Sequence, residues 1–245
     1  MLCADFLILT TLCVSRKGSA LAIDPNQGLL QSQYADPLLD ARSFGFYPNI
    51  FKRILDLIGV LLLAIPAILI VGIFAILIAL TGANPFYSQE RVGKNGRIFR
   101  MWKLRSMVPN AKERLNEYLA QNPEARAEWD KTQKLKNDPR ITKIGHFIRK
   151  TSLDELPQLL NVYIGDMSLV GPRPMMREQR TLYPGQAYYK LSPGITGFWQ
   201  VSERNETSFA ERAYYDTSYL QQLSFTTDLR VLLKTVAVVL RGTGC

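Results

Sequence analysis

The sequence predicts an α+β membrane protein that combines a Pro-broken re-entrant membrane helix, a small β-hairpin and a helical cytoplasmic domain with interfacial amphipathic helices. Three observations favour this class: one long apolar run, an Asn-Gly pair between two strand-like segments, and later segments with helical periodicity. We divide the chain into a poorly ordered leader over residues 1–47, the membrane hairpin over 48–82 and the cytoplasmic domain over 83–245.

The leader contains an apolar stretch that superficially resembles a secretory signal peptide. Its basic pair, Arg16 and Lys17, follows the apolar residues, and Asp5 opens the segment. A signal peptide carries its positive charge before the apolar region. We therefore expect a poorly ordered leader instead of a signal peptide.

The apolar run extends from Ile54 to Leu80, and Asp56 is its only charged residue. Pro66 stands in its middle, and a break there would leave two arms of roughly 20 Å, each shorter than the ~30 Å hydrocarbon core of a bilayer. Basic residues flank both ends, which favours placing both ends in the cytoplasm. We therefore prefer a re-entrant hairpin, although a tilted, Pro-kinked transmembrane helix stays open.

The segment from Phe86 to Met107 is predicted to form two strands around Asn95-Gly96, the strongest short signal for a β-hairpin. Its basic residues include Lys103 and Arg105, which could contact phosphate or lipid headgroups or simply form a solvated face. From Val108 to Lys136 the pattern is helical and is interrupted at Pro123.

The run from Asp228 to Leu240 is apolar but only 13 residues long, too short to cross a bilayer. We expect it to form either a buried core helix or a helix lying in the membrane interface.

The composition bears on the partners of the chain. A formal net charge of +9 over 245 residues favours ligands that carry phosphate, such as nucleic acid, anionic lipid or a phosphorylated substrate. No nucleic-acid-binding motif is evident, and nucleic-acid binding would leave the apolar run unexplained. The three cysteines lie near the termini without metal-ligand spacing, and the single histidine, His146, is expected to be structural.

The most informative stretch surrounds two adjacent carboxylates, Asp154 and Glu155. Because Pro157 is best tolerated in a first helical turn, we expect a helix to begin between Ser152 and Leu156, with both carboxylates at its positive end. A purely structural alternative is equally open at this point. Ser152 and Glu155 match the S-x-x-E pattern of a capping box, in which the glutamate only satisfies the helix end.

The neighbours of these carboxylates favour chemistry on phosphate. Arg149 and Lys150 precede them, and Arg173 follows within a Gly-Pro-Arg-Pro segment, so cations are predicted near the same helix end. These cations would keep Asp154 ionised at neutral pH and able to attack phosphorus. Glu155 could then bind Mg²⁺ together with phosphate oxygens. A glycosidase is disfavoured because adjacent carboxylates can hardly flank a sugar.

From about residue 48 to its end, the chain resembles the bacterial sugar transferase family, the monotopic phosphoglycosyl transferases. The resemblance rests on these features in order: Lys52-Arg53 with Asp56, the apolar run with Pro66, Lys103 to Met107, Asn137 to Arg140, Thr151 to Asn161, Gly165 to Pro174, and Pro193 to Val201. The family often has serine before the membrane proline, where this chain has Ile65.

The resemblance implies a re-entrant membrane helix at the bacterial inner membrane and a catalytic domain facing the cytoplasm. It implies that Asp154 takes a phosphosugar from a UDP-sugar, with UDP-galactose or UDP-glucose favoured, and that undecaprenyl phosphate then accepts it, with Mg²⁺ as cofactor. The expected ligands of substrate or phosphate are Arg149, Arg173, Lys103, Arg105 and Gln200, with Asp216 and Asp228 as weaker polar candidates. A homodimer is a further expectation. The competing hypothesis is a non-catalytic basic module at the membrane surface.

Overall fold

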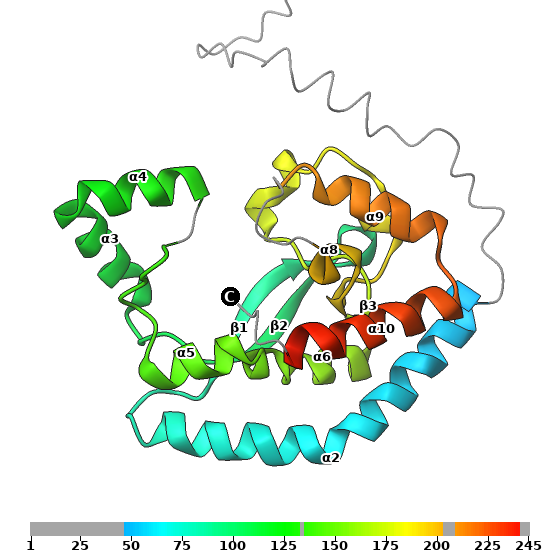
Figure 1. Cartoon of the computed structure of the whole chain (residues 1–245), viewed down its shortest axis with the longest axis horizontal. Coiled ribbons are helices and arrows are strands. Elements are labelled where there is room, and N and C mark those ends of the chain that lie inside the picture. Colours follow the sequence, from blue (N-terminus) through cyan, green and yellow to red (C-terminus); the bar gives the residue numbers. More distant parts are fainter. Residues whose placement is uncertain (1–46, 133–134, 203–208, 241–245) are drawn as a thin grey trace, which may run out of the picture.

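A long apolar helix runs beneath a mixed domain of helices and short strands (Figure 1). The computed structural model describes residues 47–132, 135–202 and 209–240, so the predicted leader, apart from Tyr47, lies outside the described residues. The apolar helix, α2, extends over Lys52–Ala79 after a π-helical turn at Tyr47–Phe51. By length and composition it is able to cross a membrane.

The predicted break at Pro66 is wrong in one respect, because α2 continues through this proline as a single helix. Figure 1 shows a change of direction along α2 instead of an interruption. A proline removes one backbone hydrogen bond and crowds the preceding turn, which bends a helix without ending it when the flanking residues favour helix.

The other elements follow in chain order. They are β1 (Phe86–Val92), η3 (Lys94–Gly96), β2 (Ile98–Leu104), α3 (Ala111–Gln121), α4 (Pro123–Thr132), α5 (Lys143–Lys150), η4 (Leu153–Glu155), α6 (Gln158–Ile164), β3 (Ser168–Val170), η5 (Arg177–Leu182), α7 (Ala187–Lys190), β4 (Gly194–Thr196), α8 (Phe198–Val201), α9 (Arg212–Gln221) and α10 (Phe225–Leu240).

The predicted hairpin is confirmed. Strands β1 and β2 pair antiparallel, with Val92 opposite Ile98 next to the turn. Asn95 and Gly96 both have positive φ angles, 57° and 77°, a conformation that these two residue types adopt more readily than others. The predicted interruption of the helical segment is also confirmed, since α4 begins at Pro123.

The N-terminal end of α2 is fixed to the domain by polar contacts. Arg53 donates hydrogen bonds to the carbonyl oxygens of Val162 and Tyr163 in α6, at 2.5 and 2.7 Å. Asp56 accepts hydrogen bonds from the Ser168 hydroxyl and the Leu169 amide at 3.0 and 2.8 Å. Arg53, a basic residue expected to flank the apolar run, and Asp56, the one charged residue within it, therefore attach the helix to its own domain.

The other end of α2 packs against the same domain. Ile78 is buried in a cluster with Leu104 of β2 and Ile148 of α5. Between the two ends, Val60 and Ala67 join the main core together with residues of α6 and β3. The opposite face of α2 is exposed and apolar.

Helix α10 combines the two environments predicted for it. Its Asp228 and Val231 are buried against the domain, whereas Leu233 and Val236 are 64% and 57% exposed. One face therefore belongs to the core and the other is an uncovered apolar surface.

Candidate active site

The two adjacent carboxylates lie in the short turn η4, between α5 and α6. A helical turn does begin within the expected stretch, but it is only the short 3-10 helix η4, and the α-helix α6 begins later, at Gln158, with Pro157 at its N-cap. The capping-box alternative is wrong, because Ser152 has a φ of 57° and its side chain makes no capping hydrogen bond. An N-cap residue needs an extended backbone to direct its hydroxyl at the helix end, and a left-handed residue does not provide this direction.

One lysine holds the carboxylate pair. The Nζ of Lys103, on β2, lies 2.8 Å from Oε1 of Glu155 and 3.6 Å from Oδ2 of Asp154. Asp154 is buried, with only 8% of its surface exposed. The hairpin thus supplies a cation to the carboxylates, as expected for a phosphate-handling site.

Burial raises the pKa of Asp154, and the charge of Glu155 raises it further, whereas Lys103 and Arg149 lower it. The cations expected beside Asp154 do lower its pKa, but burial outweighs them and the net shift is upward, because removing a carboxylate from water disfavours its charged form. A carboxylate with a raised pKa is also a stronger base when it is ionised.

Arg149 is held in place by a neighbouring segment. Its Nε donates a hydrogen bond of 2.8 Å to the Ser106 hydroxyl, and its charge acts on Asp154. The backbone of Ser106 touches α5 closely, since a Cβ on Gly145 would lie 1.9 Å from the Ser106 carbonyl oxygen. Glycine at 145 therefore allows the contact that positions Arg149.

Arg105, a predicted phosphate ligand, is engaged elsewhere. Its Nε donates to the Asn84 carbonyl oxygen at 2.6 Å, and its guanidinium lies over the Tyr87 ring. These contacts hold it at the linker that follows α2. Of these three predicted phosphate ligands, Lys103 and Arg149 interact with the carboxylates, whereas the contacts given for Arg105 in the described part of the chain are with Asn84 and Tyr87.

The segments around Gly171 and Gly194 run side by side, because β3 and β4 pair in parallel. A Cβ on Gly194 would lie 2.1 Å from the Gly171 amide, and one on Gly197 would lie 2.1 Å from the Gly171 carbonyl oxygen. Only glycine permits two backbones to approach so closely. This close approach positions Arg173, whose guanidinium lies over the Trp199 ring at 5.6 Å, and the buried Gln200.

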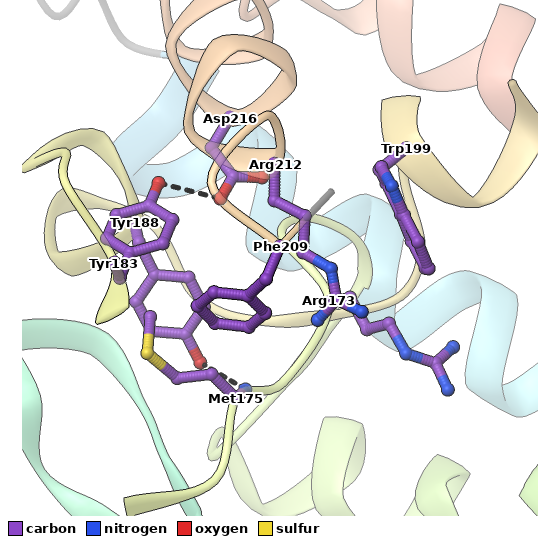
Figure 2. A pocket seen from close by; sticks show the side chains of 8 residues that line it. All are labelled: Arg173, Met175, Tyr183, Tyr188, Trp199, Phe209, Arg212 and Asp216. Atoms are coloured by element: carbon purple, nitrogen blue, oxygen red, sulfur yellow. Dashed lines mark hydrogen bonds between the residues drawn. The ribbon is translucent and has the colours of Figure 1, made fainter. Parts of the chain in front are cut away.

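An aromatic pocket lies beside Arg173 (Figure 2). Its lining residues are Arg173, Met175, Tyr183, Tyr188, Trp199, Phe209, Arg212 and Asp216. Asp216 accepts a 2.8 Å hydrogen bond from the Tyr183 hydroxyl, and burial raises its pKa to about 7. The weak candidate Asp216 thus belongs to this pocket.

The other weak candidate, Asp228, has a structural environment. It is fully buried and receives hydrogen bonds from Lys52, Tyr47 and Tyr219 at 2.7, 2.7 and 2.6 Å. Arg212, which lines the pocket, and Arg91, whose charge acts on Arg212, were not identified as site residues from the sequence. Only the general excess of basic residues pointed to them.

Asp154 and Glu155 are the carboxylates available to a metal ion at this site. The described residues contain no group of three or more His, Cys, Asp or Glu side chains able to hold one. Two carboxylates are sufficient for the kind of Mg²⁺ site that substrate phosphate completes.

Comparison with known proteins gives consistent matches. The model of the bacterial sugar transferase family matches residues 47–242. The UDP-galactose-lipid carrier transferase of Erwinia amylovora is 52% identical over 198 residues, which cover 79% of this chain and 41% of that protein. The undecaprenyl-phosphate galactose phosphotransferase of Salmonella typhimurium is 52% identical over 165 residues, which cover 66% of this chain and 35% of that protein.

A shorter relative matches over most of its length. The exopolysaccharide production protein ExoY of Rhizobium meliloti is 42% identical over 199 residues, which cover 79% of this chain and 87% of that protein. The chain thus spans less than half of the two longer relatives but nearly all of the shorter one.

Proposed function

The chain belongs to the bacterial sugar transferase family, and from this premise we propose that it transfers a hexose 1-phosphate from a UDP-sugar to undecaprenyl phosphate. The names of the relatives support a lipid-carrier acceptor and a galactose or glucose donor. The observation that carries the proposal is the buried Asp154 beside Glu155, with Lys103 in contact with both.

In the proposed first step, an Oδ atom of ionised Asp154 attacks the phosphorus that carries the sugar. The bond from this phosphorus to the bridging oxygen breaks, and UMP leaves with the electron pair. In the second step, a phosphate oxygen of undecaprenyl phosphate attacks the same phosphorus and releases the Asp154 carboxylate. Each step exchanges one phosphorus–oxygen bond for another.

Lys103 and Arg149 serve this reaction through their charge. Both favour the ionised form of Asp154, which burial disfavours. Lys103 also holds Glu155 at 2.8 Å. We propose that Glu155 holds Mg²⁺ jointly with the donor diphosphate, and the bound ion would neutralise charge on the leaving group.

We further propose that α2 is re-entrant and that the domain lies on the cytoplasmic side of the inner membrane. Polar contacts attach the start of α2 to α6 and β3, and Ile78 near its end packs on Leu104 and Ile148. A helix that spans a bilayer separates its two ends by about 30 Å of hydrocarbon, so one folded domain could hardly contact both ends. The exposed apolar middle of α2 supports immersion in lipid.

A UMP-release assay tests the activity. With UDP-galactose or UDP-glucose, Mg²⁺ and no acceptor, we expect the wild type to release at most one UMP per protein, and Asp154→Asn to release none. Undecaprenyl phosphate should make release continuous. Normal release by the folded Asp154→Asn variant removes Asp154 as the nucleophile, and the absence of release by the wild type with any UDP-sugar favours the non-catalytic surface module.

Cysteine labelling tests the topology. Ile50→Cys and Asn84→Cys stand on either side of α2 and are both expected to react with an impermeant reagent only from the cytoplasmic side. Labelling of the two positions from opposite sides contradicts the re-entrant arrangement.

A further inference from the structure

Three arginines from distant parts of the chain gather at the aromatic pocket: Arg173 and Arg212 line it, and Arg91 donates a hydrogen bond to the Pro174 carbonyl oxygen, one residue after Arg173. Arg91 comes from β1, Arg173 from the loop after β3 and Arg212 from the start of α9. Arg173 and Arg212 both lie over the Trp199 ring, at 5.6 and 4.2 Å (Figure 2). Arg91 is within electrostatic range of Arg173 and of Glu155.

The positive charge of this arginine cluster, Arg91, Arg173 and Arg212, is poorly balanced. Within the described residues, none of the three forms an ion pair within 4.0 Å. Burial, together with the charge of Arg173, lowers the pKa of both Arg91 and Arg212 to about 10, so both stay charged at neutral pH. Asp216, the carboxylate that acts on Arg212, has its own pKa raised to about 7.

Two hydrogen-bond donors of the cluster are also buried without a partner. They are the Nε atoms of Arg91 and Arg212. The Nη atoms of Arg91 donate to the Pro174 carbonyl oxygen and to Gln89, and the guanidinium of Arg212 stacks between Trp199 and Phe209. Unsatisfied buried donors are costly, and clustered guanidinium groups are the arrangement that binds phosphate most strongly.

We propose that Arg91, Arg173 and Arg212 together bind the nucleotide phosphate of the donor, the one that departs as nucleoside monophosphate. This inference rests on the proposed function and adds Arg91 and Arg212 to it. Arg91 stands on β1, which pairs with β2, and β2 carries the Lys103 that contacts both carboxylates, so one hairpin connects the cluster with the groups that act on the neighbouring phosphorus.

The acceptor also carries a phosphate, but the position of the cluster favours the nucleotide. Arg212 opens helix α9 at the end that lies away from α2 (Figure 1), whereas the other end of α9 reaches the start of α2, where Lys52 donates a hydrogen bond to the Tyr219 hydroxyl. A lipid phosphate stays near the membrane helix, whereas a water-soluble nucleotide reaches the far side.

Equilibrium binding of UMP and of uridine to the detergent-solubilised full chain tests this inference without requiring turnover. We expect Arg91→Gln and Arg212→Gln each to weaken UMP binding by at least about tenfold, as for a lost charge-assisted hydrogen bond. Arg177→Gln is the matched control, because Arg177 is exposed and pairs with Glu90, and it should change UMP binding less than about twofold. Uridine binding should be the same in all variants.

Each other outcome overturns the assignment. Unchanged UMP binding in both variants removes the cluster from the nucleotide site. An equal loss of UMP and uridine binding shows a structural role in place of a phosphate contact. An increased KM for undecaprenyl phosphate with unchanged UMP binding assigns the cluster to the acceptor.

Two further measurements distinguish a failure of this inference from a folding defect and from a failure of the proposed function. Where Arg212→Gln does not fold, Arg212→Lys keeps the charge and removes the guanidinium fork, and it should still weaken UMP more than uridine. If the wild type binds UMP but releases none from any UDP-sugar, the proposed function fails. The binding data still show whether the arginine cluster contacts the phosphate of UMP.

Discussion

The ammonium group of Lys52 lies 2.7 Å from the carboxylate of Asp228, and both side chains are buried where the apolar helix α2 meets the domain. Lys52 also donates to the Val170 carbonyl oxygen at 2.9 Å. The pair therefore connects the start of α2 with α10 and β3, and the basic residue that precedes the apolar run is part of the folded core.

Removing one member of this pair should destabilise the protein strongly. In Lys52→Met the Asp228 carboxylate stays buried without its main cation, and we expect a loss of about 3–5 kcal/mol in the free energy of unfolding. The double variant Lys52→Met/Asp228→Asn should recover part of this loss. Thermal unfolding in detergent measures both, and additive losses in the double variant contradict the coupling.

The raised pKa of Asp154 predicts an acidic limb in the pH dependence of UMP release. The nucleophile must be ionised, so release in the absence of acceptor should fall with decreasing pH at values above about 4, where an ordinary aspartate is still ionised. Lys103 lowers this pKa, so Lys103→Met should move the limb to higher pH, and Lys103→Arg should move it less. A limb that stays in place or moves to lower pH contradicts this role.

Asp216 makes stability depend on pH in a defined direction. Its pKa is about 7 in the folded state and near 4 in the unfolded chain, so the folded state holds its proton more tightly. This contribution to stability is present in full below pH 4 and is lost as the pH rises through 7. The melting temperature of Asp216→Asn, which can still accept the Tyr183 hydrogen bond, should therefore exceed that of the wild type increasingly from pH 5 to pH 8. Parallel curves refute the assignment.

Local signals predicted the hairpin and the interruption at Pro123 because turn residues act on their immediate neighbours. The same local reasoning was wrong at Ser152, where the S-x-x-E pattern depends on a backbone conformation that the residue does not adopt. It was also wrong about an interruption of α2, since a proline in a strongly helical run bends the helix instead.

The long-range parts of the site could not be predicted from spacing. Arg91 and Arg212 come near Arg173 only through the fold, and no local pattern distinguishes these buried arginines from the exposed arginines of the chain. Likewise Lys52 and Asp228 are 176 residues apart, so their pairing depends on how α2 and α10 pack. The direction of the Asp154 pKa shift required the burial of the side chain, which the charges of neighbouring residues do not reveal.

The close contact of Gly145 with Ser106 predicts that a change in the packing of α5 also slows UMP release. In Gly145→Ala the new methyl group would lie 1.9 Å from the Ser106 carbonyl oxygen, so α5 must shift away from the segment that holds Arg149. We expect a loss of about 1–3 kcal/mol in the free energy of unfolding and slower UMP release.

Two comparisons separate these effects. Gly72→Ala is the matched control, because nothing lies within 4 Å of the added methyl group in α2, and it should preserve both stability and activity. Ser106→Ala removes the hydrogen bond to Arg149 without a clash, so it should slow UMP release while costing less stability than Gly145→Ala. If Ser106→Ala releases UMP at the wild-type rate, the contact between Ser106 and Arg149 does not position the arginine for Asp154, and the effect of Gly145→Ala is one of packing alone.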